Sequence, residues 1–284
     1  MRRRNAHRST RQRTALSKRL RRPTLRPRLE RLENRRVLAA VSGLITSNLT
    51  FTDPSDPVEF VADTQIASGV IVEVGANVPV RISENINVTV DGMLKFDHSA
   101  GVEITDGSGG QDSGIVVSGT GTLDIDDTDF TRRTISNALD RTRIAVVAGG
   151  KFMATDSRFD WDTVVFDDGS LIADASTTWV QSNEFNQTIS VPYQHLQDAS
   201  RLADNLRFED INILAGSLPT GETLDLNLIG TATTVDLRYV FPSGFEIQSN
   251  ATLSVNQGVS VLLKEDKQIS VDGTLKFDNA ASMV

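Results

Sequence analysis

The sequence predicts an all-β protein whose body is a right-handed parallel β-helix, or β-solenoid, behind a disordered basic N-terminal segment. Three observations lead to this prediction. A glycine followed by alternating apolar residues recurs along the chain, two of its spacings are 29 residues, and a longer segment is repeated 181 positions further on. Repeats of this kind indicate architectures in which each unit buries its apolar row on its neighbours.

Residues 1–43 form the basic segment, which we predict to be disordered and to act in export. Residues 1–36 contain fourteen arginines and Lys18 against Glu30 and Glu33, a net charge of +13, so the rest of the chain carries −21 for a total of −8. Like charges at this density repel, and little apolar surface offsets the chain entropy. An arginine-rich arm also suits nucleic acid, but the acidic body would repel a polyanion, so no nucleic-acid partner is expected.

Residues 29–40, which read LERLENRRVLAA, resemble the N-terminal sorting segment of large planctomycete extracellular proteins. The shared pattern is two spaced Leu-Glu pairs, an arginine and a Leu/Ala-rich end. The resemblance implies a secreted or cell-surface location, with the export machinery as a partner of residues 1–43, and it implies no activity for the body. No run approaches the roughly 18 apolar residues that a membrane span requires, so none is predicted.

Five glycines begin the short repeat and are predicted at coil corners: Gly92, Gly121, Gly150, Gly169 and Gly273. Glycine supplies the positive φ of a tight corner, and residues two and four positions later point to one face of a strand. Asp, Ser and Thr residues then form the next corner through side-chain-to-backbone hydrogen bonds. An aromatic residue follows at a nearly fixed offset, as Phe130, Phe159 and Trp179, and is expected to point inward.

The long repeat relates residues 58–103 to residues 239–284, where 15 of 46 positions are identical without a gap. We therefore divide the body into a β-helix repeat region, 44–238, and the start of a second copy, 239–284. This division is what a larger array, or a truncated one, would give. Segments 131–143 and 181–210 interrupt the rhythm and are predicted as loop insertions. The second contains a pattern compatible with a short helix over 195–206.

Stretches such as Phe245–Val255 resemble the strands of right-handed parallel β-helices in bacterial surface proteins, including adhesins, and in pectate-lyase-like folds. The resemblance implies the fold and leaves the activity open. A tandem β-sandwich is the rival architecture. It predicts hairpins with antiparallel pairs, and it does not require two consecutive periods of the same length.

Stacking in register places Asp127 above Asp156, about 4.8 Å away. Two carboxylates that close disfavour joint ionisation, and exposure, protonation or a bridging Ca²⁺ relieves the repulsion. Asp127, Asp129 and Asp156 are therefore a candidate calcium site, with solvated corner residues as the alternative reading. No other cofactor is expected, and the absence of cysteine excludes disulfides and thiolate metal sites.

Three classes of function fit the sequence. We expect a non-catalytic extracellular scaffold, structural or adhesive, that binds surface glycans or proteins multivalently. One alternative is a polysaccharide-active β-helix enzyme, a lyase or glycoside hydrolase that uses Asp126–Asp127 or Asp167–Asp168. Only His98 and His195 lie in the body, and neither neighbours a carboxylate pair, which disfavours catalysis. The other alternative is a spacer with no ligand.

Overall fold

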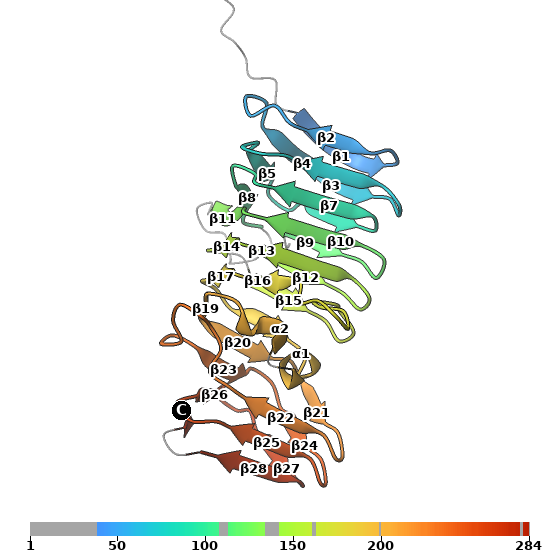
Figure 1. The fold of residues 1–284 in the computed structure, drawn as a ribbon. Coiled ribbons are helices and arrows are strands. Elements are labelled where there is room, and N and C mark those ends of the chain that lie inside the picture. The colour runs from blue at the N-terminus through green and yellow to red at the C-terminus, as the bar shows by residue number, and fades with distance from the viewer. Residues whose placement is uncertain are drawn as a thin grey trace, which may run out of the picture. The chain divides into compact units, whose positions relative to one another are not determined.

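The computed structural model describes residues 39–107, 113–133, 142–160, 163–198, 200–278 and 281–283. Residues 1–38, which hold most of the predicted export segment, and Trp161 lie outside these ranges. Over the described residues the chain consists of short strands that follow one another as stacked coils, with two short helices (Figure 1). The prediction of an all-β parallel β-helix is confirmed.

All pairings between the named strands are parallel, and they form four sheets. The largest sheet contains β1 (Ala39–Ile45), β3 (Val58–Ile66), β5 (Val80–Ile82), β6 (Asn87–Val90), β8 (Val102–Thr105), β9 (Ser113–Val117), β11 (Asp129–Arg133), β12 (Thr142–Val146), β14 (Arg158–Phe159), β15 (Thr163–Phe166), β17 (Glu184–Phe185), β18 (Ile189–Val191), β19 (Arg207–Phe208), β20 (Asp210–Ile213), β23 (Arg238–Phe241), β26 (Ser260–Leu263) and β29 (Ser282–Met283).

The second sheet contains β2 (Leu49–Phe51), β4 (Ile71–Val74), β7 (Met93–Asp97), β10 (Thr122–Asp126), β13 (Lys151–Thr155) and β16 (Val180–Gln181). Two smaller sheets contain β21 (Gly216–Leu218), β24 (Phe245–Ile247) and β27 (Ile269–Val271), and β22 (Thr223–Leu226), β25 (Thr252–Val255) and β28 (Thr274–Phe277). Within the described residues, the single antiparallel contact is an isolated bridge between Ala173 and Thr178. The β-sandwich alternative, which requires antiparallel strand pairs, is therefore excluded.

In the middle of the solenoid, each turn contributes one strand to each of three rows, as β7, β8 and β9 do, followed by β10, β11 and β12. Thr122 pairs with both Met93 and Lys151. Residues that meet across these coils, such as Ser99 with Thr128 and Asp126 with Thr155, are 29 residues apart, as the glycine spacing predicts. In the preceding coil, Glu73 and Lys95 meet at a separation of 22 residues. Coil length therefore varies while the strand register is kept.

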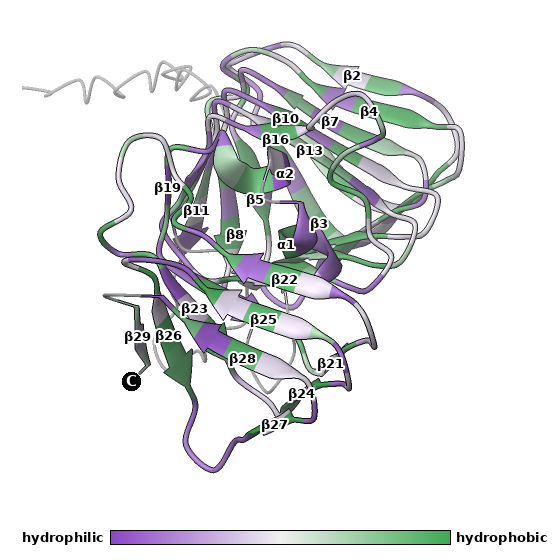
Figure 2. Ribbon diagram, turned by 60° about the horizontal axis from the view of Figure 1, so that its bottom comes forward, coloured by the Kyte–Doolittle hydropathy of each residue, from purple (hydrophilic) through white to green (hydrophobic). Residues whose placement is uncertain are grey.

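The core is built of columns of inward side chains that stack from coil to coil. In the second sheet, Val72, Leu94, Leu123 and Phe152 pair in register and are fully buried. Figure 2 shows the alternation of apolar and polar positions along β22, β25 and β28. Complete burial of one such side chain stabilises the fold by about 1.5–3 kcal/mol, so each coil is held mainly by its neighbours.

A column of phenylalanines forms the most regular part of the core. Phe130, Phe159, Phe185 and Phe208 stack with near-parallel rings, whose centroids are 5.2, 5.0 and 5.3 Å apart in that order. The sequence predicts the first two of these residues and then Trp179. The third place belongs to Phe185 instead, because the excursion closed by the Ala173–Thr178 bridge delays the return of the chain to the stack.

Four of the five predicted corner glycines are required for close approach of two backbones, not for the predicted positive φ. Gly169 has a φ of +78°, as a tight corner needs, but Gly92, Gly121, Gly150 and Gly273 do not adopt positive φ. These four pass close to the backbone of the preceding coil. A Cβ on any of them would approach a carbonyl oxygen too closely, that of Val70, Val90, Ser118 or Gln248, respectively. Glycine is needed there for close approach of two backbones.

Positive φ recurs instead at polar residues that follow the second sheet. His98, Asp127, Asp156 and Ser182 have φ values of 53°, 43°, 50° and 58°. They occupy one column, since β7, β10, β13 and β16 pair in register just before them. Short polar side chains tolerate this conformation better than branched ones, and these residues form the corners of the coils.

Some boundaries differ from those expected. β1 begins at Ala39, inside the segment assigned to export, because Val41 and Ile45 are buried and the strand pairs with β3. In segment 131–143, Thr131–Arg133 belong to β11 and pair with β8, and residues 134–141 lie outside the described residues. Strands β1 and β11 thus include residues that the sequence assigns to the export segment and to a loop insertion.

In segment 181–210, strands β17, β18 and β19 extend the stack, so much of this predicted insertion belongs to the coils. Helices α1 (Gln194–Gln197) and α2 (Ser200–Ala203) occupy part of the predicted helix. His195 Nε2 in α1 lies 2.9 Å from the Ser170 hydroxyl, and burial lowers the pKa of His195 to about 4. Among the described residues, no helix has the length and apolar character to cross a bilayer.

The long sequence repeat is also a repeat of structure. A shift of 181 positions carries β4 onto β25 and β7 onto β28. Three left-handed positions recur at the same shift with different residues, Gly69 with Asn250, Asn77 with Gly258 and Asn85 with Asp266. The backbone conformation is therefore repeated even where the side chain is not.

Substitution of Gly121 by alanine is expected to lower the free energy of unfolding by about 3 kcal/mol or more, because the new methyl group meets a backbone carbonyl that cannot move aside. Urea denaturation measures the change. Gly75→Ala is the matched control, since its nearest new contact is 3.4 Å away and its φ is not positive. Equal effects of the two substitutions would contradict the close-approach explanation.

Candidate functional site

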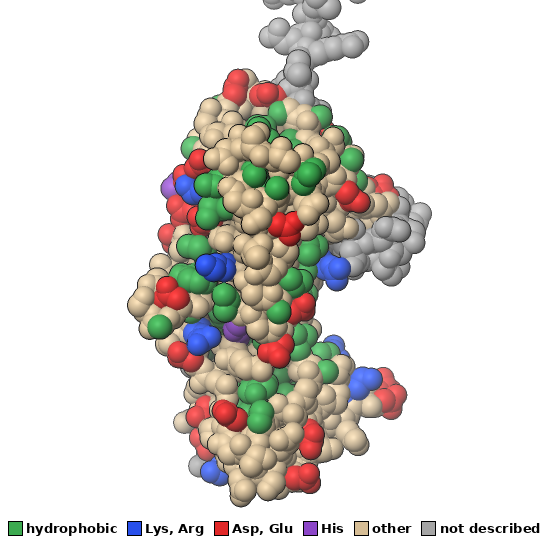
Figure 3. Space-filling model, turned by 90° about the vertical axis from the view of Figure 1, so that its right-hand side faces the viewer, with side chains coloured by type: hydrophobic (Ala, Val, Ile, Leu, Met, Phe, Trp, Pro, Cys, Tyr) green, Lys and Arg blue, Asp and Glu red, His purple; other side chains and the backbone are tan. Residues whose placement is uncertain are grey.

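A groove on the outer face of the second sheet gathers polar side chains from several of the described strands. It has a volume of about 400 Å³ and is lined by Lys95, Asp97, Asp124, Asp126, Met153, Ala154, Thr155, Thr177, Thr178, Trp179 and Gln181. On the face shown in Figure 3, acidic side chains occur singly or in small groups. The groove is therefore distinguished by its arrangement rather than by negative charge alone.

Strand alternation explains why these side chains gather. In β7 and β10 the second and fourth residues after the repeat glycine point inward, so the intervening residues face outward. Parallel register places Lys95 beside Asp124 and Asp97 beside Asp126, and Thr155 continues the second row. Repetition of the coil thus aligns outward polar residues in columns.

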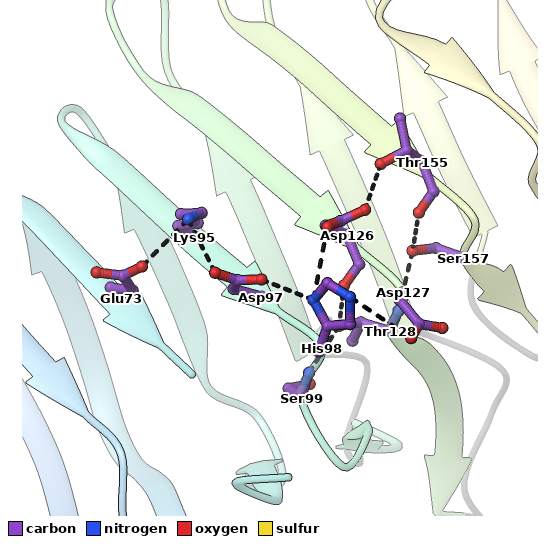
Figure 4. Close-up of polar contacts among 10 residues, drawn as sticks. All are labelled: Glu73, Lys95, Asp97, His98, Ser99, Asp126, Asp127, Thr128, Thr155 and Ser157. Carbon is purple, nitrogen blue, oxygen red and sulfur yellow. Dashed lines mark hydrogen bonds and ion pairs between the residues drawn. The ribbon is translucent and has the colours of Figure 1, made fainter. Parts of the chain in front are cut away.

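An ion-pair network runs along this face (Figure 4). Lys95 Nζ lies 3.1 Å from both Glu73 Oε1 and Asp97 Oδ2. Asp97 Oδ1 lies 2.7 Å from His98 Nδ1, and the same nitrogen is 3.6 Å from Asp126 Oδ2. The hydroxyl of Thr155 donates to Asp126 Oδ1 over 2.6 Å.

His98 stands at a coil corner between three carboxylates. Besides Asp97 and Asp126, Asp127 Oδ2 lies 3.9 Å from Nε2 on the other side of the ring. The side chain of His98 is 55% exposed, and those of Asp97 and Asp126 are 38% and 40% exposed. The imidazole is accessible to solvent and to ligands.

A buried polar ladder fixes the corner from within. The N–H of Ser99 donates to Thr128 Oγ1 over 3.2 Å, and the N–H of Thr128 donates to Ser157 Oγ over 3.1 Å (Figure 4). Thr128 Oγ1 also donates to the carbonyl of Asp126 over 2.9 Å. The residues next to His98 and Asp127 are therefore held in place, and so is the backbone that carries the outer cluster.

The surroundings of the groove shift the pKa values of its titratable groups in opposite directions. The hydrogen bond to Asp97 raises the pKa of His98, and the attraction of Asp126 and Asp127 adds to it. His98 and then Lys95 lower the pKa of Asp97. Burial raises the pKa of Asp124, although Lys95 partly offsets this. The carboxyl group of Asp97 is thus stabilised as an anion, whereas that of its diagonal neighbour Asp124 is not.

The residues predicted for calcium are only partly brought together. Asp127 and Asp156 do occupy equivalent corners of adjacent coils. Asp127 and Asp129 line a neighbouring groove of about 420 Å³ together with His98. Within the described ranges, three potential ligand atoms lie within 4.8 Å of one another only at Asp97, His98 and Asp126. Calcium at the three predicted aspartates stays a prediction.

Two residues of the candidate site, His98 and Trp179, lie elsewhere than the sequence predicts. His98 was expected to lie apart from carboxylate pairs, yet the fold places it against Asp97 and Asp126; the repeat spacing, extended back by one coil, aligns it with Asp127. Trp179, expected in the core, lines the groove, and Lys151 Nζ lies 5.9 Å from the centre of its ring. Register along the coils is the signal that locates His98, whereas the sequence carries no comparable signal for Trp179.

Comparison of the chain with protein-family models, with curated proteins and with solved structures finds no match.

Asp97→Asn is expected to lower the pKa of His98 toward its ordinary value, because the substitution replaces the charged acceptor that stabilises the imidazolium most with a neutral amide. An NMR titration of the histidine ring signals measures the pKa. His195, with a pKa of about 4, is the buried reference in the same spectrum. Asp127→Asn should lower the pKa of His98 less; an unchanged value in Asp97→Asn would contradict the assigned contact.

Proposed function

We propose that the chain is an extracellular, non-catalytic repeat scaffold that binds glycans along the outer face of its second sheet. The extracellular location is supported by the likeness of residues 29–40 to planctomycete sorting segments. Binding is supported by the groove, which combines the ring of Trp179 with carboxylates and hydroxyl groups. Sugars present an apolar ring face and many hydroxyls, which such a mixed surface can contact.

The charge of the groove selects among glycans. Lys95 is the single cation among its described lining residues, against the carboxyl groups of Asp97, Asp124 and Asp126. The net negative charge of the groove would repel a polyuronate, but it would not repel neutral or amino-bearing sugars. We therefore assign neutral and amino-sugar polymers as ligands. Repeated coils let one polymer contact several positions, which raises the overall affinity of weak contacts.

One observation favours a second candidate, polysaccharide cleavage. Asp124 has a raised pKa and Asp97 a lowered one, and pairs of carboxyl groups with such opposite shifts are how enzymes assign acid and base roles. The exposure of the groove and the tie of Asp97 to Lys95 weigh toward binding. We keep cleavage as an outcome of the same experiment.

Binding is tested by calorimetry with three soluble probes, chito-oligosaccharides, glucosamine oligomers and polygalacturonate. We expect the first two to bind and the third not to. Trp179→Ala should weaken binding about tenfold, because it removes the aromatic contact. Val235→Ala, at an apolar residue that is 86% exposed and does not line the groove, is the matched control and should change nothing.

Other outcomes of this experiment are equally informative. Release of reducing ends that is abolished by Asp124→Asn would replace the binding proposal with catalysis. Absence of binding to all three probes would leave the spacer alternative. Equal loss of affinity in Trp179→Ala and Val235→Ala would place the binding surface outside the groove.

Export is tested in a planctomycete host that produces the full chain or a chain lacking residues 1–36. We expect the full chain in the extracellular and surface fractions and the shortened chain inside the cell. Substitution of Leu29 and Leu32 by serine keeps the charge and removes the apolar part of the pattern, and it should also block export. A full chain retained inside the cell would contradict the proposed location.

A further inference from the structure

Three side chains at one corner of the solenoid turn one atom each toward a common point. Asp97 and His98 are consecutive, and Asp126 pairs with Asp97 in the next coil. His98 Nδ1 lies 2.7 Å from Asp97 Oδ1 and 3.6 Å from Asp126 Oδ2, and all three atoms lie within 4.8 Å of one another (Figure 4). We infer that Asp97, His98 and Asp126 form a binding site for a divalent transition-metal ion of the zinc class.

The separations of these atoms suit such an ion. In tetrahedral zinc sites with bonds of about 2.0–2.1 Å, neighbouring ligand atoms are about 3.3 Å apart. The two separations from Nδ1, 2.7 and 3.6 Å, fall on either side of that value. The third separation, between the two carboxylate oxygens, is within 4.8 Å, so all three atoms are near enough for one ion to be approached by side-chain rotation. The exposed position leaves room for a water or ligand atom as the fourth.

The far atom of each ligand faces an outer partner, as in metal sites whose ligands are oriented by a second layer of contacts. Lys95 Nζ lies 3.1 Å from Asp97 Oδ2, and Thr155 donates to Asp126 Oδ1 over 2.6 Å. Asp127 Oδ2 lies 3.9 Å from His98 Nε2. An imidazole that binds metal through Nδ1 keeps its proton on Nε2, and Asp127 is placed to attract that proton.

The donor set selects the class of ion. Calcium and magnesium prefer ligands that are all oxygen, whereas zinc accepts imidazole nitrogen together with carboxylate oxygen. The ion would also offset the negative charge that Asp97, Asp126 and Asp127 bring to the corner. It replaces the proton on Nδ1, so binding releases a proton from imidazolium and weakens as the pH falls. This site does not depend on glycan binding.

The test is calorimetric titration of the metal-free full chain at pH 7.5 with Zn²⁺ and, separately, with Ca²⁺. We expect one zinc site that His98→Asn weakens at least about a hundredfold. Asparagine suits this corner, because Asn77, Asn85 and Asn250 adopt positive φ elsewhere in the chain. Circular dichroism and an unchanged melting temperature confirm that the variant folds.

Three further variants sharpen the assignment. Thr155→Val removes an outer contact and should weaken zinc binding about tenfold. Asp156→Asn, at the equivalent corner two coils further on, and His7→Asn, at the histidine of the N-terminal segment, should leave it unchanged. In NMR spectra, zinc should shift the ring signals of His98 and leave those of buried His195 in place.

Several results would overturn the inference. Zinc affinity that is the same in His98→Asn as in the unaltered chain places the ion elsewhere, as does a loss confined to His7→Asn. Absence of zinc binding at pH 7.5 removes the site. Calcium binding that persists in His98→Asn but is lost in Asp156→Asn, without zinc binding, assigns the corner aspartates to calcium instead.

Discussion

From Ser99 to Asn205, each coil is joined to the next by a hydrogen bond between a backbone N–H and a buried side-chain oxygen at the same corner. The series continues from Ser157 N to Asn183 Oδ1, 3.0 Å, and from Asn183 N to Asn205 Oδ1, 3.2 Å. A buried N–H left unpaired costs about 1–3 kcal/mol, so a slip of one residue between two of these coils would lose the bond that joins them at that cost. The ladder therefore fixes which residues face outward, and the outer cluster depends on it.

Much of the fold could be predicted from the sequence, because spacing and alternation are written in residue types. The period of the coils and the inward places of Phe130 and Phe159 follow from them. The place of Trp179 could not be predicted, since the shorter interval from Gly150 to Gly169 does not reveal the small turn closed by Ala173 and Thr178. Nor does a sequence distinguish a glycine needed for positive φ from one needed for close approach, as at Gly121.

The candidate site was less accessible to prediction. Stacking correctly aligned Asp127 with Asp156, but which carboxylates converge depends on side-chain direction, which register alone does not give. The corner equivalent to Asp127 in the preceding coil is His98, and the change of residue type concealed the equivalence. Asp97 and Asp126 are equivalent by spacing and identical in type, but their contact with one histidine depends on side-chain direction. Contacts between coils, rather than neighbours in sequence, make this cluster.

The left-handed corners separate the chemistry of the surface from the stability of the core. Glycine, asparagine, aspartate, histidine and serine all occur there with the same backbone conformation. One of these residues can therefore replace another at a corner without disturbing the apolar columns inside. Column by column, the exterior of such a solenoid is free to diversify, so two related chains with the same coils need not share a ligand.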